Sequence, residues 1–444
     1  MNAQSFRQTA HVCVGSVGHE VGELTFVRDG RREYSAFSYD RSWLERAERF
    51  EISPDLPLRD GHFTRRATSE DESPFHYALA DTEPDAWGRR VIQRAHAKHR
   101  QRDRSLGPLT RFDILSAVDD FSRIGALRLR DTEGQYLRSG AVYRTPQLID
   151  LQQIYAATRA LEEGTETEAD LAFLQGKATS LGGLRPKCTI VDSDGALALG
   201  KFPSVGDTRS IVRGEVLALE LAKLIKLDVA DARIEMIDRT PVAVIRRFDR
   251  AAGARIAYLS GGSLLQAKRS EDGAYADLVD ALRRVSIRPS EDVHELWRRL
   301  VFNTMITNVD DHLWNVGVLY AGEGQWRLAP AFDLNPFPDR VRESKTWLSK
   351  DSGPITSIRQ LIEASADFGL DPGDARDEAA EMAKLLSRWR EVATSRQIGM
   401  KSTELEEFAP AFDHLESQIG RTSARKPRSA TPKKASRSRR RSRR

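Results

Sequence analysis

The feature that most constrains this chain is an acidic loop between a predicted helix and a predicted hairpin. Within the loop, Asp310 and Asn315 stand in the spacing D-x-x-x-x-N. Apolar residues recur at helical spacing over 291–305, and two apolar runs around a glycine-containing turn fill 316–329. Asp333 follows the second run. We therefore expect a helix to deliver the loop and a hairpin to carry the chain on to Asp333.

Three oxygen-bearing side chains in this pattern are typical of metal-assisted phosphoryl transfer. In a kinase catalytic loop with this spacing, the Asp accepts a hydroxyl proton and the Asn binds the metal. Mg²⁺ prefers hard oxygen ligands and keeps several waters, so Asn315 and Asp333 together with substrate phosphates would suffice. An Asp-Asp pair such as Asp310-Asp311 is common in solvated loops. The prediction therefore depends on the elements around the pair.

Signals for a nucleotide site lie upstream, in the order that a kinase requires. Residues 180–187 read Ser-Leu-Gly-Gly-Leu-Arg-Pro-Lys, a glycine turn with two cations that could bind phosphate. The turn lacks the Gly-Lys-Ser/Thr ending of a P-loop, which excludes that motif. Lys201 ends the second strand of a predicted hairpin, and Glu215 or Glu220 on the next helix could orient it. The sequence leaves the choice of glutamate open.

Two further sequence features are weaker signals of a nucleotide site. Arg246, Arg247 and Phe248 end a strand and, as a connection between two lobes, would offer backbone groups to an adenine edge. His312 could orient the loop or contact phosphate, although a lone His in an acidic loop is more often structural. A zinc site is rejected because no second His is clustered with it. Each signal is weak alone, and their order along the chain favours a nucleotide-dependent phosphotransferase.

The predicted elements give an α+β, bilobal, kinase-like fold in four regions. Residues 1–140 form a small β-rich N-terminal subdomain, and 141–250 form an ATP-binding region like a kinase N-lobe. Residues 251–420 form a largely helical C-lobe with the catalytic loop. Residues 421–444 are rich in Ser, Arg, Lys and Pro and are expected to be disordered.

Strands are predicted at 11–15, 22–27, 33–38, 125–130, 188–191, 196–202, 233–237, 241–245, 316–320 and 325–329. Helices are predicted from 84, at 109–118, from 145, and at 211–227, 275–285, 291–305, 357–365, 374–395 and 403–418. The segment 54–74 is predicted to be irregular.

The formal net charge of +4 hides a division within the chain. Residues 421–444 hold 12 Lys and Arg and no acid, so the remainder has 57 basic and 65 acidic residues and a charge of −8. The tail could bind nucleic acid through counterion release, and a solubilising tail without a partner is equally favoured. Two cysteines, Cys13 and Cys188, cannot build a disulfide framework or a metal cluster. With no secretory signal or membrane-length apolar run, we expect a cytoplasmic protein without a membrane partner.

With these motifs the chain resembles the HipA family of bacterial type II toxin–antitoxin Ser/Thr kinases. The resemblance spans nearly all of 1–420. The segments that carry it are 180–187, Lys201-Phe-Pro203, Arg247-Phe-Asp-Arg250, Asn308-Val-Asp-Asp-His-Leu-Trp-Asn315, Leu328-Ala-Pro-Ala-Phe-Asp333 and, in the N-terminal subdomain, Phe37-Ser-Tyr-Asp40 and Asp85-Ala-Trp-Gly-Arg89. The sequence departs from the family at Arg246, which replaces a common hinge acid, and in the tail of 421–444.

The resemblance implies a fold related to the phosphoinositide kinases, with ATP and Mg²⁺ as cofactors. Asp310 would be the catalytic base, Asn315 and Asp333 the metal ligands, and Ser180 the autophosphorylated serine. The residues that would line ATP are Gly182, Gly183, Leu184, Arg185, Pro186, Lys187, Lys201, Arg246, Arg247, Phe248, His312, Leu313, Trp314, Asn315, Phe332 and Asp333.

Known members of the family phosphorylate an aminoacyl-tRNA synthetase or another translation-associated protein, arrest growth and are neutralised by a small DNA-binding antitoxin. The resemblance therefore implies a persistence-related toxin kinase with a protein substrate and a HipB-like antitoxin as partners. Two alternatives stay open: a lipid or small-molecule kinase, and a non-catalytic partner in a DNA-bound repressor complex.

Overall fold

Five antiparallel strands near the start of the chain form the first sheet of this computed structural model, which describes residues 6–30, 32–69, 72–139, 145–175, 183–268 and 272–415. The sheet order is β4-β3-β2-β1-β5, from β1 (Phe6–Val14), β2 (His19–Asp29), β3 (Arg32–Tyr39), β4 (Phe63–Arg66) and β5 (Leu127–Arg130). Along β3 the buried residues are Ser35, Phe37 and Tyr39, the alternation of a sheet with one face in the core. Three short helices accompany the sheet: α1 (Arg41–Glu45), α2 (Tyr77–Ala80) and α4 (Arg111–Ser116).

The prediction that 54–74 is irregular was wrong at β4. This four-residue strand pairs with β3 at the edge of the sheet, and none of its side chains is fully buried. An edge strand of this kind needs no apolar alternation, because one side faces water and its pairing comes from the backbone. The sequence therefore gave no signal for it.

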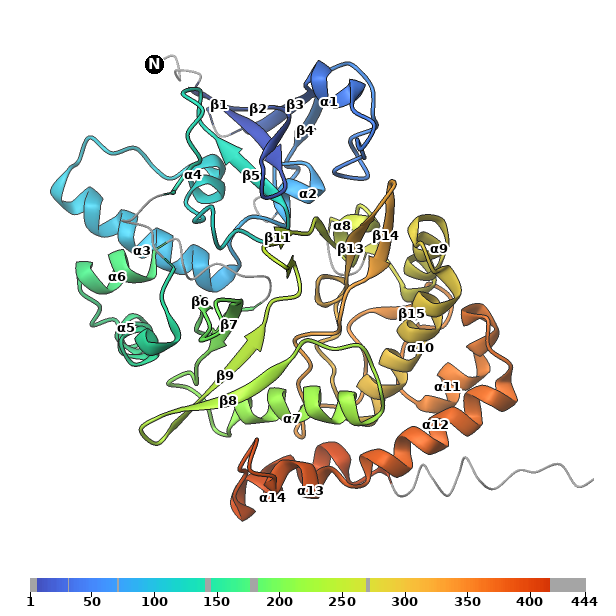
Figure 1. Cartoon of the computed structure of the whole chain (residues 1–444). Coiled ribbons are helices and arrows are strands. Elements are labelled where there is room, and N and C mark those ends of the chain that lie inside the picture. The colour runs from blue at the N-terminus through green and yellow to red at the C-terminus, as the bar shows by residue number, and fades with distance from the viewer. Residues whose placement is uncertain are drawn as a thin grey trace, which may run out of the picture.

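The second sheet has the order β6-β7-β9-β8, from β6 (Lys187–Val191), β7 (Leu197–Lys201), β8 (Ala232–Ile237) and β9 (Thr240–Arg246). Both faces are covered, because alternate residues of β9 enter different cores. Val242 and Val244 pack with α3 (Ala86–Arg102), α5 (Leu151–Glu163) and α6 (Glu168–Leu174), whereas Ala243 and Ile245 join the larger core that includes α7 (Ile211–Leu224). Figure 1 shows α7 beneath β8 and β9, with α5 and α6 on the far side of the sheet.

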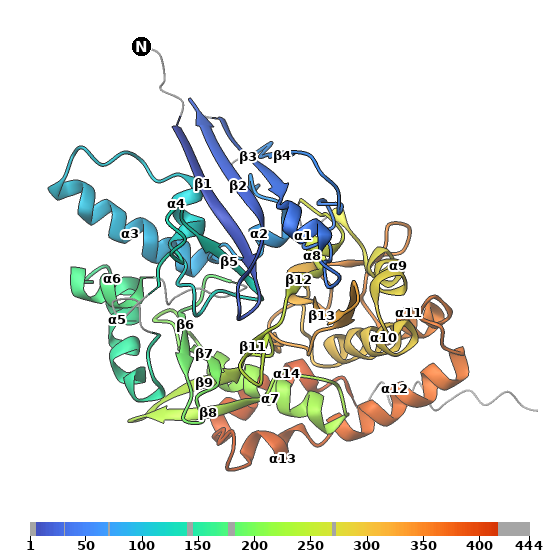
Figure 2. The same cartoon turned by 45° about the horizontal axis from the view of Figure 1, so that its top comes forward.

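The C-terminal part is chiefly helical and surrounds a small sheet with the order β12-β13-β14 (Figure 2). Its helices are α8 (Gly261–Leu264), α9 (Tyr275–Val285), α10 (Pro289–Met305), α11 (Ile358–Glu363), α12 (Pro372–Leu386), α13 (Trp389–Thr394) and α14 (Ser402–Phe412). Its strands are β12 (Tyr258–Ser260), β13 (Gly317–Gly322) and β14 (Gln325–Leu328), with the short pairs β10 (Arg250–Ala251) and β11 (Ala254–Arg255), and β15 (Trp347–Ser349) and β16 (Gly353–Pro354).

The predicted helix over 374–395 is two helices. The chain leaves α12 at Ser387 and restarts at Trp389, whose ring stacks on Phe412 of α14 with centroids 4.5 Å apart. Packing of this large buried ring favours the break, whereas helix propensity alone would favour one continuous helix. The predicted helix over 403–418 ends as a described helix at Phe412.

The α+β class, with an N-terminal β-rich part and a helical C-terminal part, is confirmed. Three predicted features lie outside the described residues: Ser180, Gly182 and the tail of 421–444. Among the described helices, none is both long and apolar enough to cross a membrane.

A buried carboxylate joins the first sheet region to the strand end after β9. Asp249 accepts hydrogen bonds from Arg247 Nη2 at 2.5 Å, Arg250 Nη1 at 2.7 Å and the backbone N–H of Gly125 at 2.7 Å. The two arginines also donate to the backbone oxygen of Arg123. Burial alone would raise the pKa of Asp249, but the two guanidinium groups outweigh it and lower that pKa to about 2.

Replacing Asp249 by Asn should lower the free energy of unfolding by about 3 kcal/mol or more, because removing one member of a buried ion pair leaves the other charge uncompensated. The folded pKa lies below the unfolded value of about 3.9, so this stabilisation is present above the unfolded pKa and is lost as pH falls through about 2. Urea unfolding at neutral pH and at a series of acidic pH values measures both effects. Asp194→Asn is the matched control, because Asp194 pairs with Arg246 at the surface and should matter little. Equal stability of the Asp249→Asn and wild-type proteins at neutral pH would contradict this account.

Candidate active site

A buried lysine connects three elements that are distant in sequence. Lys201, the last residue of β7, donates to Glu215 Oε1 of α7 at 2.6 Å and to Asp333 Oδ1 at 2.7 Å. The side chains of Lys201, Glu215 and Asp333 are 12%, 4% and 20% exposed. Glu220 instead pairs with Lys223 at 2.9 Å. The structure therefore selects Glu215 from the two glutamates that the sequence left open.

Burial and charge oppose one another in this trio. Burial alone would raise the pKa of Asp333, but the ammonium groups of Lys201 and Lys187 outweigh it and hold that pKa below its ordinary value. Burial also acts to lower the pKa of Lys201, and the two carboxylates outweigh it and raise that pKa. Burial raises the pKa of Glu215 in spite of the neighbouring ammonium. Asp333 is thus kept ionised and Lys201 charged.

The backbone at Asp333 adopts a conformation that is uncommon for a residue with a side chain. Its φ is +54°, in the left-handed region, where a non-glycine residue is strained. The segment before it is fixed, because Ala331 exchanges backbone hydrogen bonds of 2.9 and 2.8 Å with Ala230 and Asp228. Strain held by surrounding structure is characteristic of functional sites.

The catalytic-loop candidates lie just after α10. Asn315, in the one-turn 3₁₀ helix Leu313–Asn315, donates from Nδ2 to the backbone oxygen of Asp310 at 2.9 Å. Its Oδ1 is buried and has no hydrogen-bond partner among the described residues. The same is true of Oδ1 of Asn335, whose Nδ2 lies 3.4 Å from Asp333 Oδ1. Two buried amide oxygens therefore lack partners among the described residues, and that of Asn335 belongs to a side chain that contacts the Asp333 carboxylate.

This donor set suits a hard cation. The described residues contain no cluster of three or more His, Cys, Asp and Glu side chains able to hold a metal. Mg²⁺ does not require such a cage, because one or two carboxylates with phosphates and waters commonly hold it. Asn315, Asp333 and Asn335 fit that chemistry. Sequence reasoning missed Asn335, although its place two residues after Asp333 was a usable signal.

Asp310 is the more accessible of the two neighbouring acids. Its side chain is 41% exposed and forms an ion pair with Lys345, which is 54% exposed. Asp311 is buried and accepts from Tyr275 Oη at 3.0 Å and from the backbone N–H of Lys345 at 2.8 Å. Burial raises the pKa of Asp311 to about 6. Asp311 therefore fixes the loop against the backbone of Lys345, and Asp310 is the more accessible of the two carboxylates.

The described part of the glycine turn rests on the start of α3. Lys187 forms a buried ion pair with Asp85 at 2.8 Å, and Asp85 also caps α3 by accepting from Gly88 N at 2.8 Å. The backbone N–H of Trp87 donates to Gly183 O at 3.4 Å. Lys187 is therefore held near Asp333 by a residue of the N-terminal region.

Four other residues predicted to line ATP have contacts or exposure that the structure defines. Arg185 pairs with Asp207, Pro186 accepts from Phe202 N at 3.0 Å, and Leu184 is 73% exposed. The Arg246 side chain points to Asp194 at 2.6 Å. The backbone N–H of Arg246 donates to Asp231 O at 2.7 Å.

Aromatic and loop residues complete the site. Phe248 and Phe332 lie together with ring centroids 5.5 Å apart. His312 has a buried Nδ1 without a hydrogen-bond partner among the described residues, and burial lowers its pKa. Leu313 is fully buried in the core, and Trp314 packs on Gly262 of α8. Among the predicted residues, the structure thus brings Lys201 into contact with Asp333 and Phe248 into contact with Phe332.

Comparisons with known proteins agree with this architecture. The family model described as HipA N-terminal domain matches residues 12–130, and that described as HipA-like C-terminal domain matches residues 179–389. A Sinorhizobium fredii protein named "Putative kinase Y4mE" is 28% identical over 338 residues, which cover 71% of this chain and 75% of that protein. HipA of Shewanella oneidensis, solved in a complex with HipB and its operator DNA, has a TM-score of 0.65 and 18% identity over 93% of this chain and 97% of its own. At that identity the structural likeness establishes the fold.

Replacing Lys201 by Met should destabilise the protein by about 3–5 kcal/mol, because Glu215 and Asp333 would be left buried without their shared cation. Urea unfolding followed by circular dichroism measures the change. Lys223→Met is the matched control: Lys223 pairs with Glu220 and Asp231 at a more exposed site, where an ion pair contributes about 0–1 kcal/mol. Similar losses in the two variants would show that the buried trio has no special role in stability.

Proposed function

The chain belongs to the HipA family, and we propose that it is an ATP- and Mg²⁺-dependent protein serine/threonine kinase that acts as the toxin of a toxin–antitoxin pair. One observation carries the proposal: Lys201 holds both Glu215 and Asp333, next to the loop with Asp310 and Asn315. A strand lysine paired with a helix glutamate, and a metal-binding aspartate beside the catalytic loop, are the parts on which kinases depend.

Each residue of the site has a role in this proposal. Asn315 and Asp333 hold Mg²⁺, with Asn335 as a further oxygen donor, and the bound ion supplies positive charge to the phosphates. Lys201, oriented by Glu215, contacts phosphate oxygens. Asp310 accepts the proton of the acceptor hydroxyl.

Other residues around the site hold these groups in position. Asp311 fixes the loop through Tyr275 and the backbone of Lys345. The Lys345 ammonium pairs with the Asp310 carboxylate at the mouth of the loop. The glycine turn, anchored by the Lys187–Asp85 pair, covers the phosphates.

Family membership supports the identity of the partners. We propose a translation-associated protein, such as an aminoacyl-tRNA synthetase, as the substrate, with growth arrest as the consequence. The Shewanella oneidensis HipA was solved with HipB and operator DNA, which supports a HipB-like DNA-binding antitoxin for this chain. Autophosphorylation at Ser180 and a cytoplasmic location belong to the same proposal.

Replacing Asp310 by Asn should leave the fold and nucleotide binding intact and reduce phosphotransfer by about 10²–10⁴-fold, the usual contribution of a general base. Transfer of labelled phosphate to proteins of a bacterial lysate, and growth of cells that express the protein, measure the effect. Asp351→Asn, in the exposed turn between β15 and β16, should behave as wild type. A folded Asp310→Asn protein with wild-type transfer would rule out this base.

Replacing Asp333 by Ala should abolish most of the Mg²⁺-dependent part of ATP affinity, because Asn315 and Asn335 are neutral and cannot replace the lost charge. Calorimetric titration with ATP, with and without Mg²⁺, isolates that part. Asp339→Ala is the control, since Asp339 is 62% exposed and pairs with Arg209. An unchanged Mg²⁺ dependence in Asp333→Ala would remove Asp333 from the ligand set.

A further inference from the structure

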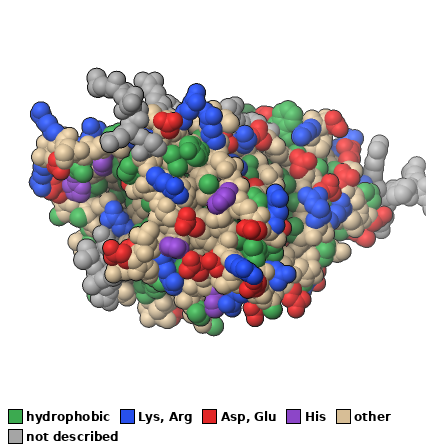
Figure 3. All heavy atoms as spheres, turned by 90° about the horizontal axis from the view of Figure 1, so that it is seen from above, with side chains coloured by type: hydrophobic (Ala, Val, Ile, Leu, Met, Phe, Trp, Pro, Cys, Tyr) green, Lys and Arg blue, Asp and Glu red, His purple; other side chains and the backbone are tan. Residues whose placement is uncertain are grey.

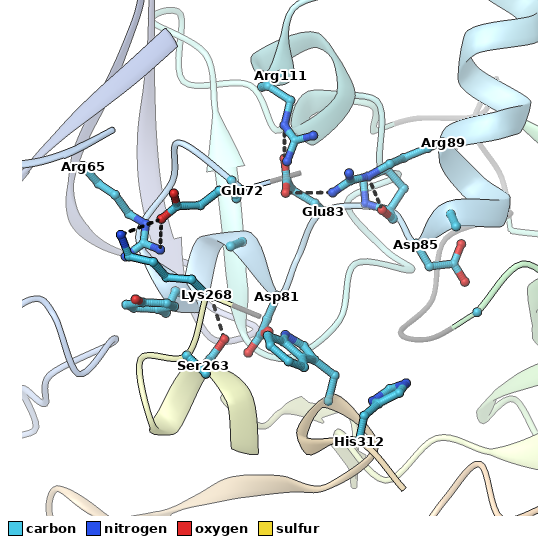
Figure 4. Close-up of a pocket in the computed structure, with 18 residues that line it drawn as sticks. Arg65, Glu72, Asp81, Glu83, Asp85, Arg89, Arg111, Ser263, Lys268 and His312 are labelled. Atoms are coloured by element: carbon cyan, nitrogen blue, oxygen red, sulfur yellow. Dashed lines mark hydrogen bonds and ion pairs between the residues drawn. The ribbon is translucent and has the colours of Figure 1, made fainter. Parts of the chain in front are cut away.

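A cavity of about 330 Å³ lies between the N-terminal region and the catalytic loop. His312 and Trp314 line it from the catalytic loop, and Gly183 lines it from the glycine turn. Most of its remaining wall comes from the N-terminal region and Lys268. Figure 4 shows two groups of charged wall residues, with Asp81, Asp85 and His312 apart from them. The cavity therefore adjoins the proposed site of phosphotransfer without containing the Lys201 trio.

In the first group, one carboxylate is shared by two arginines. Glu83 accepts from Arg89 Nη2 at 3.0 Å, and its second oxygen lies 3.5 Å from Arg111 Nε. The Glu83 side chain is 2% exposed. Nη2 of Arg111 is buried and has no hydrogen-bond partner among the described residues. Among the described residues, Arg111 therefore keeps a guanidinium nitrogen that Glu83 does not use.

In the second group, two cations again lie around one carboxylate. Glu72 lies 3.5 Å from both Arg65 Nη2 and Lys268 Nζ, and its other oxygen already accepts from Thr68. The Arg65 guanidinium stacks over Tyr77, 3.7 Å from the ring centroid, which fixes its plane. Lys268 is 50% exposed, so its ammonium can reach a bound molecule. Both of these ion pairs are long.

The remaining carboxylates of the cavity have partners of their own. Asp81 accepts from Ser260 N at 2.7 Å and from Ser260 Oγ at 2.8 Å. Asp85 is held by Lys187 and Gly88. Arg65 also pairs with Asp55 at 3.6 Å. Among the described wall residues, the cationic groups left for a bound molecule are therefore Arg111 Nη2, which has no hydrogen-bond partner, and the half-exposed Lys268 ammonium.

We propose that this cavity receives an acidic side chain of the acceptor polypeptide, so that the enzyme prefers Ser or Thr close to Asp or Glu. The inference rests on the proposed kinase function and names its acceptor class. Arginine forks match carboxylates in a bidentate geometry, and charge-assisted hydrogen bonds are stronger than neutral ones. His312 lines the cavity and lies in the same loop as Asp310, so the acceptor hydroxyl is expected on a residue close in sequence to the acidic side chain.

Size and charge favour an acidic peptide over a nucleic acid. A cavity of about 330 Å³ is at the lower end of small-ligand sites, with room for a few side chains. A nucleic acid strand instead requires a continuous basic groove. The face seen from above in Figure 3 mixes Lys and Arg with Asp and Glu over its surface.

The test uses the full-length protein and a peptide library with one Ser or Thr and each flanking position set in turn to Asp, Glu, Asn, Gln or Lys. The wild-type enzyme should prefer Asp or Glu at one or two positions through a lower KM. Lys268→Ala and Arg89→Ala should each raise the KM for the best acidic peptide by about tenfold, the effect of losing one hydrogen bond to a charged group. The kcat and the acceptor-free hydrolysis of ATP should stay unchanged. Arg359→Ala, at an 85% exposed site on α11, is the control.

Charge reversal provides a second readout. Lys268→Glu should weaken the use of the acidic peptide and improve the use of the peptide with Lys at the same position, which a merely misfolded variant would not do. The inference is overturned if wild-type enzyme shows no acidic preference, or if the variants keep the wild-type KM. Competition by a single-stranded oligonucleotide that disappears in Lys268→Glu would overturn the polypeptide assignment. If wild-type protein labels neither peptides nor lysate proteins, the proposed kinase function itself fails.

Discussion

The site depends on one ammonium group held between two carboxylates. Lys201 comes from a strand of the second sheet, Glu215 from the helix below that sheet, and Asp333 from the C-terminal part of the chain. Burying three charges is costly unless each has a partner, so this contact is stable only when both parts of the molecule are folded and correctly placed. The same contact keeps Asp333 ionised and fixes its direction. The stability of this contact and the ionised state of Asp333 thus have a single physical origin.

The sequence was informative wherever one local pattern decided the structure. The helix over 275–285, the glycine-containing turn between β13 and β14, and the two strands of β6 and β7 are set by apolar periodicity and turn residues, and the structure has them. The order of Lys201, the loop with Asp310 and Asn315, and Asp333 was also readable. The glutamate partner of Lys201 could not be predicted from the sequence, because Glu215 and Glu220 lie on one helix and only the packing of that helix decides between them.

The features that sequence reasoning missed depend on contacts between distant segments. Lys345 reaches Asp310 only because Asp311 binds the backbone of the same residue. Asn335 follows Asp333 closely in the sequence, but its buried oxygen without a partner is seen only in the structure. The break after α12 depends on the stacking of Trp389 on Phe412. None of these has a periodic signature, because each is settled by tertiary packing.

Helix α3 shows that the two matched family domains are not two separable bodies. It lies within the segment matched as the N-terminal domain, yet its Trp87 and Val91 fill the core beneath the second sheet together with Leu151 and Ile154. Cutting the chain between the two matches would expose this shared core on both pieces, and neither would be expected to keep its shape. A chimaera that took one of the two segments from a relative would place core residues of α3 against core residues of α5 from a different protein. The two matched segments therefore share one core, even though the family models match them separately.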